Sequence, residues 1–174
     1  MKIKDITLIG VFTAVLLGGQ LALSGISGIE IVTVLFATFV YARGVKNGLM
    51  LAICFSLIRC LIFGFIPTII ILYLVYYNLF AVVVGGVAFA FKRNLNLKTV
   101  VLLTVVVTAF TILFTALDNV ITPLFYNYGK EATKAYILAS LYAVIPQSIC
   151  AVVTMSFLFF PLMKLYERLN LINE

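Results

Sequence analysis

TIIILYLVYYNLFAVVVGGVAFAF, residues 68–91, is an uncharged and almost wholly apolar run that ends at Lys92 and Arg93. About 20 consecutive apolar residues are enough for an α-helix to cross the hydrocarbon core of a bilayer. Pro67 stands directly before the run and favours the first turn of a helix, while it disfavours helical backbone at Ile66. The run therefore predicts a transmembrane helix.

The composition extends this prediction to the whole chain. Of 174 residues, 64% are hydrophobic and 10% are charged, and the mean hydropathy is +1.23. Soluble domains average about 45–50% apolar and about 25% charged residues, and disordered chains are poor in aliphatic and aromatic residues. Both classes are excluded. The length leaves room for about six spans and none for a soluble domain of typical size, so we expect residues 1–174 to form one all-α integral membrane domain.

Further apolar runs lie on both sides of the first and complete the expected bundle of six transmembrane helices. Together with residues 68–91, the expected spans are residues 6–23, 29–42, 49–63, 99–122 and 146–165. Pro123 and Pro146 are expected to end the fifth span and to start the sixth. Residues 135–145 are moderately apolar, which predicts either a helix on the membrane surface or an early extension of the last span.

The basic residues are distributed unequally between the two sides of this bundle. One side carries nine of them: Lys2, Lys4, Arg43, Lys46, Lys92, Arg93, Lys98, Lys164 and Arg168. The other side carries only Lys130 and Lys134. The positive-inside rule then predicts that both termini are cytoplasmic. Topology and anionic headgroups thus explain the net charge of +6, and no basic stripe with interleaved aromatic residues predicts a nucleic-acid partner.

The residue inventory argues against an enzyme. The chain has no histidine, which removes the central ligand or base of zinc proteases, His-based triads and haem-bearing spans. It contains no GxSxG, HExxH or P-loop sequence. Its three cysteines form no CxxC pair and fall within apolar runs, where they are expected to be small buried residues. We therefore expect no catalytic residue, no metal site and no cofactor.

Small residues recur at every fourth position of the first span and form a stripe along one side of the helix. Its members are Gly10, Ala14, Gly18 and Ala22. Such a stripe lets another helix approach closely in lipid, where no hydrophobic effect drives association. Two interpretations stay open: packing against a neighbouring span of this chain, or docking of an external membrane protein.

Polar residues follow one face of the fifth span at helical spacing. They are Thr104, Thr108, Thr111, Thr115, Asp118 and Thr122. Threonine hydroxyls can bond to carbonyls of their own helix, so the threonines alone carry little information. A carboxylate within a span is costly, however, and normally faces a partner group or a watery cavity. Asp118 is therefore the informative member of this face.

Counting residues along each span places most polar side chains at one depth, in the outer half of the membrane. The expected ligand-binding set is Glu30, Arg59, Tyr73, Tyr77, Asn78, Asp118, Asn119 and Gln147. Small-molecule sites combine aromatic walls with a few convergent polar groups, as this set does. Loops around Glu30 and residues 126–128 are expected to cover the site. The alternative is a structural ion pair between Arg59 and Asp118, with interfacial tyrosines.

The pattern resembles the substrate-binding S component of energy-coupling factor (ECF) vitamin transporters. The resemblance covers almost the whole chain and rests on GIEIVTVLFATFVYARGVKNG (residues 28–48) and LIFGF…YYNLFAVVVGGVAFAFKR (residues 61–93). The short second span, the long fourth span and the proline at the start of the last one are also similar. In that family two alanines four residues apart on helix 1 dock the coupling protein, and here a glycine replaces one of them, at Gly10 or Gly18. The tryptophan-rich pockets of its thiamin binders are absent.

The resemblance implies a protein of a bacterial-type plasma membrane that captures a vitamin or related micronutrient outside the cell. It also implies delivery together with a membrane coupling (T) protein and two cytoplasmic ATPase subunits. Two alternatives remain. One is a structural membrane scaffold of the rod-shape morphogenesis type, which needs no polar cluster in its outer half. The other is a small stand-alone secondary carrier, for which two repeated halves with interrupted helices are expected and are not visible.

Overall fold

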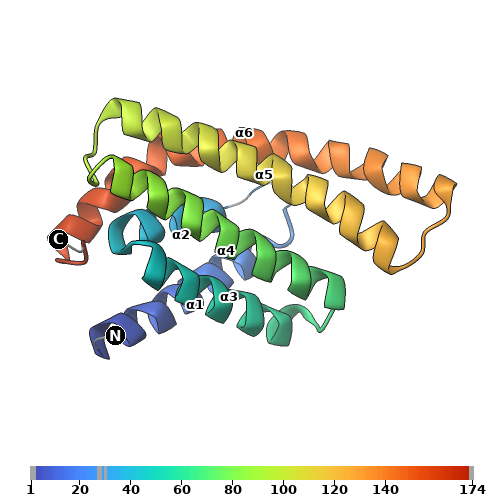
Figure 1. The fold of residues 1–174 in the computed structure, drawn as a ribbon, viewed down its shortest axis with the longest axis horizontal. Coiled ribbons are helices and arrows are strands. Elements are labelled where there is room, and N and C mark those ends of the chain that lie inside the picture. Colours follow the sequence, from blue (N-terminus) through green and yellow to red (C-terminus); the bar gives the residue numbers. More distant parts are fainter. Residues whose placement is uncertain (1–2, 27–28, 30, 173–174) are drawn as a thin grey trace.

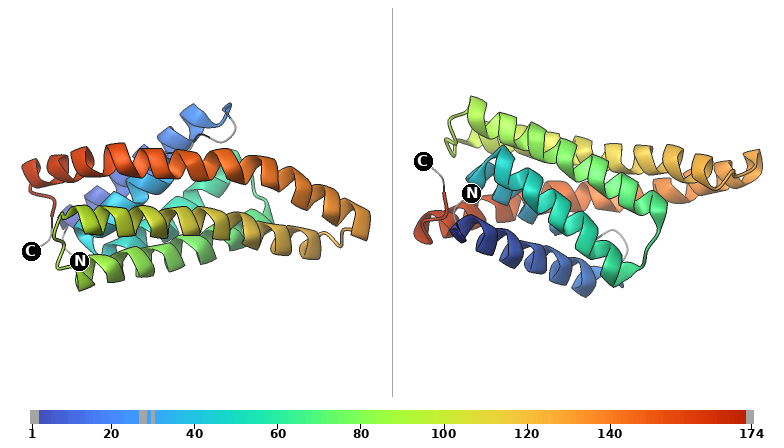
Figure 2. Two further views of the ribbon diagram at one scale, coloured as in Figure 1. Left: turned by 90° about the horizontal axis from the view of Figure 1, so that it is seen from above. Right: turned by 60° about the horizontal axis from the view of Figure 1, so that its bottom comes forward.

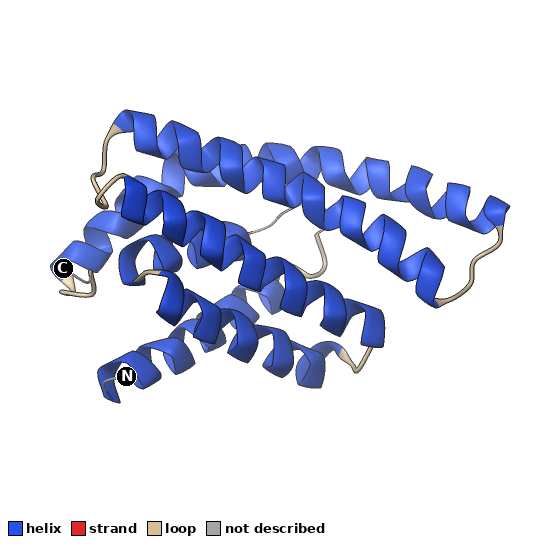
Figure 3. Cartoon of the chain, in the orientation of Figure 1, coloured by secondary structure: helices blue, strands red, loops and turns tan. Residues whose placement is uncertain are grey.

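The computed structural model describes residues 3–26, 29 and 31–172 of the chain. These residues form helices joined by short loops, and no strand occurs among them (Figure 3). The helices are α1 (Ile3–Leu23), α2 (Val32–Arg43), α3 (Val45–Phe63), α4 (Pro67–Ala90), α5 (Leu97–Phe125) and α6 (Lys130–Arg168). The prediction of an all-α protein is confirmed for the described residues, and their six helices match the six expected spans in number.

Successive helices run in opposite directions, so both chain termini lie at one end of the bundle (Figures 1 and 2). We call this the terminal end, and it also holds the α2–α3 and α4–α5 connections. The opposite, distal end holds the α1–α2 and α3–α4 connections. Five of the helices are long and apolar enough to cross a membrane, which fits a multi-pass membrane protein.

The exception in length is α2, which is the central helix of the bundle. It has 12 residues, or about 18 Å at 1.5 Å per residue, against a hydrocarbon core of about 30 Å. It contacts every other helix, and nearly all of its side chains are buried. An apolar surface on all sides is what such a position requires. The second expected span is thus a core helix too short to cross a bilayer by itself.

Aromatic rings fill the space between α2, α4 and α5. The ring of Phe36 packs on Tyr77 and Phe80 of α4, with centroids 5.0 and 5.8 Å apart. Phe80 in turn packs on Phe110 of α5 at 5.0 Å. Aromatic pairs at these separations contribute about 0.5–1.5 kcal/mol beyond the area they bury. This core fixes the tyrosine-bearing face of α4 relative to α5.

α5 and α6 form a long antiparallel pair that projects beyond α3 and α4 at the distal end (Figures 1 and 2). α6 has 39 residues, or about 58 Å. Pro123 and Pro146 lie inside these helices, so the expectation that they mark helix ends is wrong. Residues 135–145 are the early extension of the last helix. Proline has helical φ and removes one backbone hydrogen bond, a loss that packing between α5 and α6 offsets.

At the terminal end, Arg43 links α2 to α1 and to the C-terminal segment. Arg43, the last residue of α2, forms an ion pair with Asp5 of α1. Its Nη1 also donates a hydrogen bond to the carbonyl oxygen of Leu171, at 3.0 Å. The C-terminal segment after α6 is thereby held against the start of the bundle.

Candidate functional site

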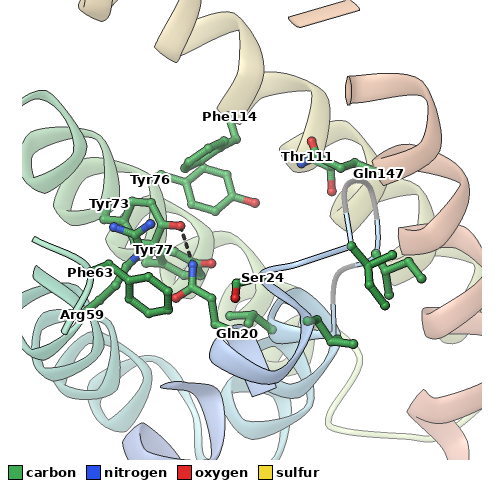
Figure 4. Close-up of a pocket in the computed structure, with 14 residues that line it drawn as sticks. Gln20, Ser24, Arg59, Phe63, Tyr73, Tyr76, Tyr77, Thr111, Phe114 and Gln147 are labelled. Carbon is green, nitrogen blue, oxygen red and sulfur yellow. Dashed lines mark hydrogen bonds between the residues drawn. The ribbon is translucent and has the colours of Figure 1, made fainter. Parts of the chain in front are cut away.

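A cavity of about 340 Å³ lies in the distal half of the bundle, lined by residues of all six helices and of the connection between α1 and α2 (Figure 4). We call it the aromatic cavity. Small-molecule sites commonly occupy about 300–1,000 Å³. The lining residues are Gln20, Leu23, Ser24, Ile26, Ile29, Val32, Arg59, Phe63, Tyr73, Tyr76, Tyr77, Thr111, Phe114 and Gln147.

Arg59 of α3 is held in this cavity by aromatic faces. Its guanidinium carbon lies 4.2 Å from the ring centroid of Tyr73 and 5.0 Å from that of Phe63. Its buried Nε atom has no hydrogen-bond partner among the residues that the structure describes. Cation–π contacts of this kind contribute about 0.5–2 kcal/mol. They do not neutralise the charge, so the cavity carries a cation with unused hydrogen-bonding capacity.

Gln20, in the last turn of α1, supplies a second polar group with unused capacity. Its amide nitrogen donates to the hydroxyl of Tyr73 at 3.0 Å (Figure 4). Its Oε1 atom is buried and accepts no hydrogen bond from the described part of the chain. Burying such an acceptor costs about 1–3 kcal/mol. A ligand that donates to this oxygen would remove the cost.

Tyrosines of α4 and a phenylalanine of α5 form the wall of the cavity. Tyr76 is in edge contact with both Tyr77 and Phe114, each at a centroid distance of 4.9 Å. Tyr73 and Tyr77 lie 5.3 Å apart. Across from them, Thr111 and Gln147 lie close together (Figure 4). The cavity therefore offers flat ring faces on one side and hydroxyl and amide groups on the other.

A second, smaller cavity of about 270 Å³ lies farther toward the distal end, between α3, α4, α5 and α6. Arg59, Tyr73 and Phe114 line both cavities. Asp118 lines only this second one, which we call the Asp118 cavity. Its carboxylate accepts hydrogen bonds from Thr122, at 2.7 Å, and from Tyr136 of α6, at 2.6 Å.

The expected site residues separate into three groups in the structure. Arg59, Tyr73, Tyr77 and Gln147 come together in the aromatic cavity. Asp118 lies next to them but in its own cavity, and no ion pair joins it to Arg59 in the described residues. Two other residues line neither cavity: Asn78 donates to the carbonyl of Leu74, and Asn119 donates to Ser140. Glu30 lies outside the described residues.

Several cavity residues were missed at the sequence level. Tyr76 and Phe114 belong to apolar runs and looked like ordinary core residues. Gln20 could have been identified from the sequence, because it is the only residue with an amide side chain within the first apolar run. The threonines of α5 behave as expected: the hydroxyls of Thr104, Thr108 and Thr111 bond to carbonyls four residues earlier. Of these, Thr111 alone lines the aromatic cavity.

The stripe of α1 faces the outside of the molecule. All four of its members, Gly10, Ala14, Gly18 and Ala22, are exposed. A Cβ atom added at Gly10 or Gly18 would meet nothing within 4 Å. Within the described residues, the stripe therefore does not pack against another helix of this chain.

Within the described residues, no group of three or more His, Cys, Asp and Glu side chains could hold a metal ion. Comparison with known proteins gives no match to a family model, to a curated protein or to a solved structure.

Asp118→Asn and Tyr136→Phe are each expected to lower the thermal stability of the protein in detergent. Asp118 joins α5 to α6 through Tyr136, and hydrogen bonds to a charged group contribute about 1.5–3 kcal/mol, or less inside a membrane. The double variant should be little worse than either single one, because both remove the same bond. Tyr142→Phe, on the exposed side of α6, is the matched control and should leave the melting temperature unchanged. Additive losses would contradict a shared bond.

Proposed function

We propose that the protein is a substrate-capture (S) component of an ECF-type importer, binding a small vitamin-like molecule in the aromatic cavity. The proposal rests mainly on the environment of Arg59, whose charged group lies among aromatic rings and has no carboxylate partner within the described residues. A cation within a span costs about 2.5–3.5 kcal/mol or more and is normally functional. A membrane scaffold has no use for such a group, whereas a binding site does.

The arrangement of the cavity defines the ligand chemically. An anionic group would pair with Arg59, a flat ring would stack on Tyr73, Tyr76 or Tyr77, and a donor would reach Gln20 Oε1. Thr111 and Gln147 are placed to bond to polar atoms at the far side of the ring. The ligand is thus a compact, planar molecule with at least one negative charge.

The remaining parts of the proposal concern delivery. The exposed stripe of α1 is the docking surface for the membrane coupling protein, which carries two ATPase subunits. The protein lies in a bacterial-type plasma membrane with its terminal end in the cytoplasm and the aromatic cavity toward the outside. The nine-to-two distribution of basic residues supports this orientation.

Native mass spectrometry of the detergent-purified protein tests the ligand part of the proposal directly. We expect a co-purifying molecule that is released by unfolding and absorbs as an aromatic or heteroaromatic ring. Recovery of a ligand-free protein from cells that take up labelled micronutrients normally would contradict the proposal.

The orientation is tested by cysteine labelling in intact cells. On a background lacking Cys54, Cys60 and Cys150, Lys46→Cys and Asn94→Cys should resist a membrane-impermeant thiol reagent, because both positions lie at the terminal end. Asn127→Cys, in the α5–α6 connection at the distal end, is the matched control and should react. The reverse pattern would place the termini outside and overturn the topology.

A further inference from the structure

The aromatic cavity and the Asp118 cavity adjoin each other, because three residues line both of them: Arg59, Tyr73 and Phe114. On α5, Asp118 follows Phe114 by about one turn, or about 6 Å along the helix axis. Residues at this spacing lie on the same side of a helix. The carboxylate of Asp118 therefore belongs to the next turn of the helix face that forms part of the wall of the aromatic cavity.

Asp118 is bound by neutral groups. One carboxylate oxygen accepts a hydrogen bond from the hydroxyl of Thr122, and the other accepts one from the hydroxyl of Tyr136. A carboxylate can accept about four hydrogen bonds, so about half of this capacity is unused within the described residues. No lysine or arginine forms an ion pair with Asp118 in that part of the chain. A half-buried carboxylate within a span thus keeps its charge without a counter-charge, which is costly.

Arg59 is the only cation among the described residues that line the Asp118 cavity, yet no ion pair joins it to Asp118. The guanidinium of Arg59 lies against the rings of Tyr73 and Phe63. The carboxylate of Asp118 instead bonds to Tyr136 of α6. Different neighbours therefore hold the two opposite charges apart along one connected space. A ligand that carries both kinds of charge would pair with each of them at once.

We propose that the ligand is a zwitterion with an amino-acid-like head group, and that Asp118 binds its protonated amino group. The flat ring lies in the aromatic cavity, the anionic group pairs with Arg59, and the ammonium group enters the Asp118 cavity. Because Arg59 lines both cavities, the anionic and amino groups are on neighbouring atoms of the ligand.

Charge balance selects this class of ligand. A cation alone would be repelled by Arg59, and an anion alone would leave Asp118 without a counter-charge. The inference rests on the proposed function, to which it adds a positive charge on the ligand and a residue that recognises it.

Three indole compounds test the two charges of the ligand separately. L-Tryptophan carries both charges, indole-3-propionate lacks the amino group, and tryptamine lacks the carboxylate. Because the chain contains no tryptophan, the indole of the probe can be excited selectively, and its fluorescence anisotropy reports binding to the detergent-purified protein. We expect L-tryptophan to bind about 10- to 150-fold more tightly than either other compound, because each of those lacks one hydrogen-bonded charge.

Asp118→Asn separates recognition of the amino group from the structural role of Asp118, since it removes the charge and keeps the shape of the side chain. The affinity for L-tryptophan should fall to that for indole-3-propionate, whose own affinity should change little. Asn119→Ala is the matched control. It removes another hydrogen bond between α5 and α6, to Ser140, at a position that lines neither cavity. It should keep the preference for L-tryptophan even where it lowers the melting temperature.

Four outcomes would overturn the inference. A preference for L-tryptophan that survives Asp118→Asn would place the amino group elsewhere. An equal loss of affinity for L-tryptophan and indole-3-propionate in Asp118→Asn would show that Asp118 is structural. Equal binding of these two compounds to the parent protein would show that the positive charge is not recognised. Binding of none of the three compounds would exclude the amino-acid-like head group on a flat ring.

The proposed function fails on different observations. A co-purified ligand without a protonated amino group would overturn this inference and leave a capture protein for small molecules. Indole-3-propionate that binds to the parent protein and is lost in Arg59→Gln would have the same meaning when L-tryptophan binds no better. The absence of any co-purified ligand, together with no binding of the indole compounds, would contradict both.

Discussion

Replacing Arg59 by glutamine is expected to weaken ligand binding about 10- to 150-fold while leaving the ligand-free protein at least as stable as before. A hydrogen bond to a charged group contributes about 1.5–3 kcal/mol, which sets the loss of affinity. The stability expectation follows from two opposing terms. The cation–π contacts with Tyr73 and Phe63 contribute about 0.5–2 kcal/mol, whereas a cation inside a span costs about 2.5–3.5 kcal/mol. A neutral side chain removes the larger, unfavourable term.

The measurement pairs a dissociation constant for the co-purified ligand with the melting temperature of the ligand-free protein. Arg59→Lys keeps the charge but loses the planar group that stacks on Tyr73, so its affinity should be intermediate. Arg168→Gln, at the exposed end of α6, controls for the change in net charge and should affect neither quantity. If Arg59→Gln lowers the melting temperature and leaves the affinity unchanged, Arg59 is structural and the proposed site is wrong.

Much of the fold was predictable, because the hydropathy of each segment of sequence is enough to predict whether that segment forms an apolar helix. Each apolar run buries itself in lipid or protein wherever it lies, so the number of helices and the start of α4 at Pro67 followed directly from the sequence. The errors at Pro123 and Pro146 have one cause. Both predictions considered only the tendency of proline to interrupt a helix. The helices continue through these prolines because α5 and α6 pack against each other along their length. The short α2 likewise depends on its neighbours for its place in the core.

The sequence predicted the level of the candidate site residues along their helices, but not the direction in which their side chains point. Counting residues gives the level of a side chain along the bundle, and Arg59, Tyr73 and Gln147, which the count places at one level, line the same cavity. The count does not say which way a side chain points around its helix. Asn78 is at a suitable level, yet it bonds to its own backbone at Leu74. Gln20 was not predicted, because the regular spacing of small residues is the more prominent pattern in the first apolar run.

Replacing Gly18 or Ala14 by tryptophan is expected to abolish co-purification with the coupling protein and its ATPases. Close approach of two helices in lipid needs small residues along the line of contact, and one indole on that line holds the backbones several ångströms apart. The complex is captured through a tag on this chain, and its partners are identified by mass spectrometry. The expected partners include subunits with a P-loop sequence, which this chain lacks.

Neither substitution should disturb the fold or the aromatic cavity. Gly18 is exposed with open space around it, and the stripe points away from the bundle, whereas Gln20 lines the cavity from another side of α1. Val153→Trp is the matched control: it adds similar bulk to an exposed position on α6, away from the stripe, and should leave the complex intact. Loss of the complex with unchanged ligand affinity supports docking on α1. A complex that survives both stripe variants would show that the coupling protein binds elsewhere, because no close helix contact can form over an indole.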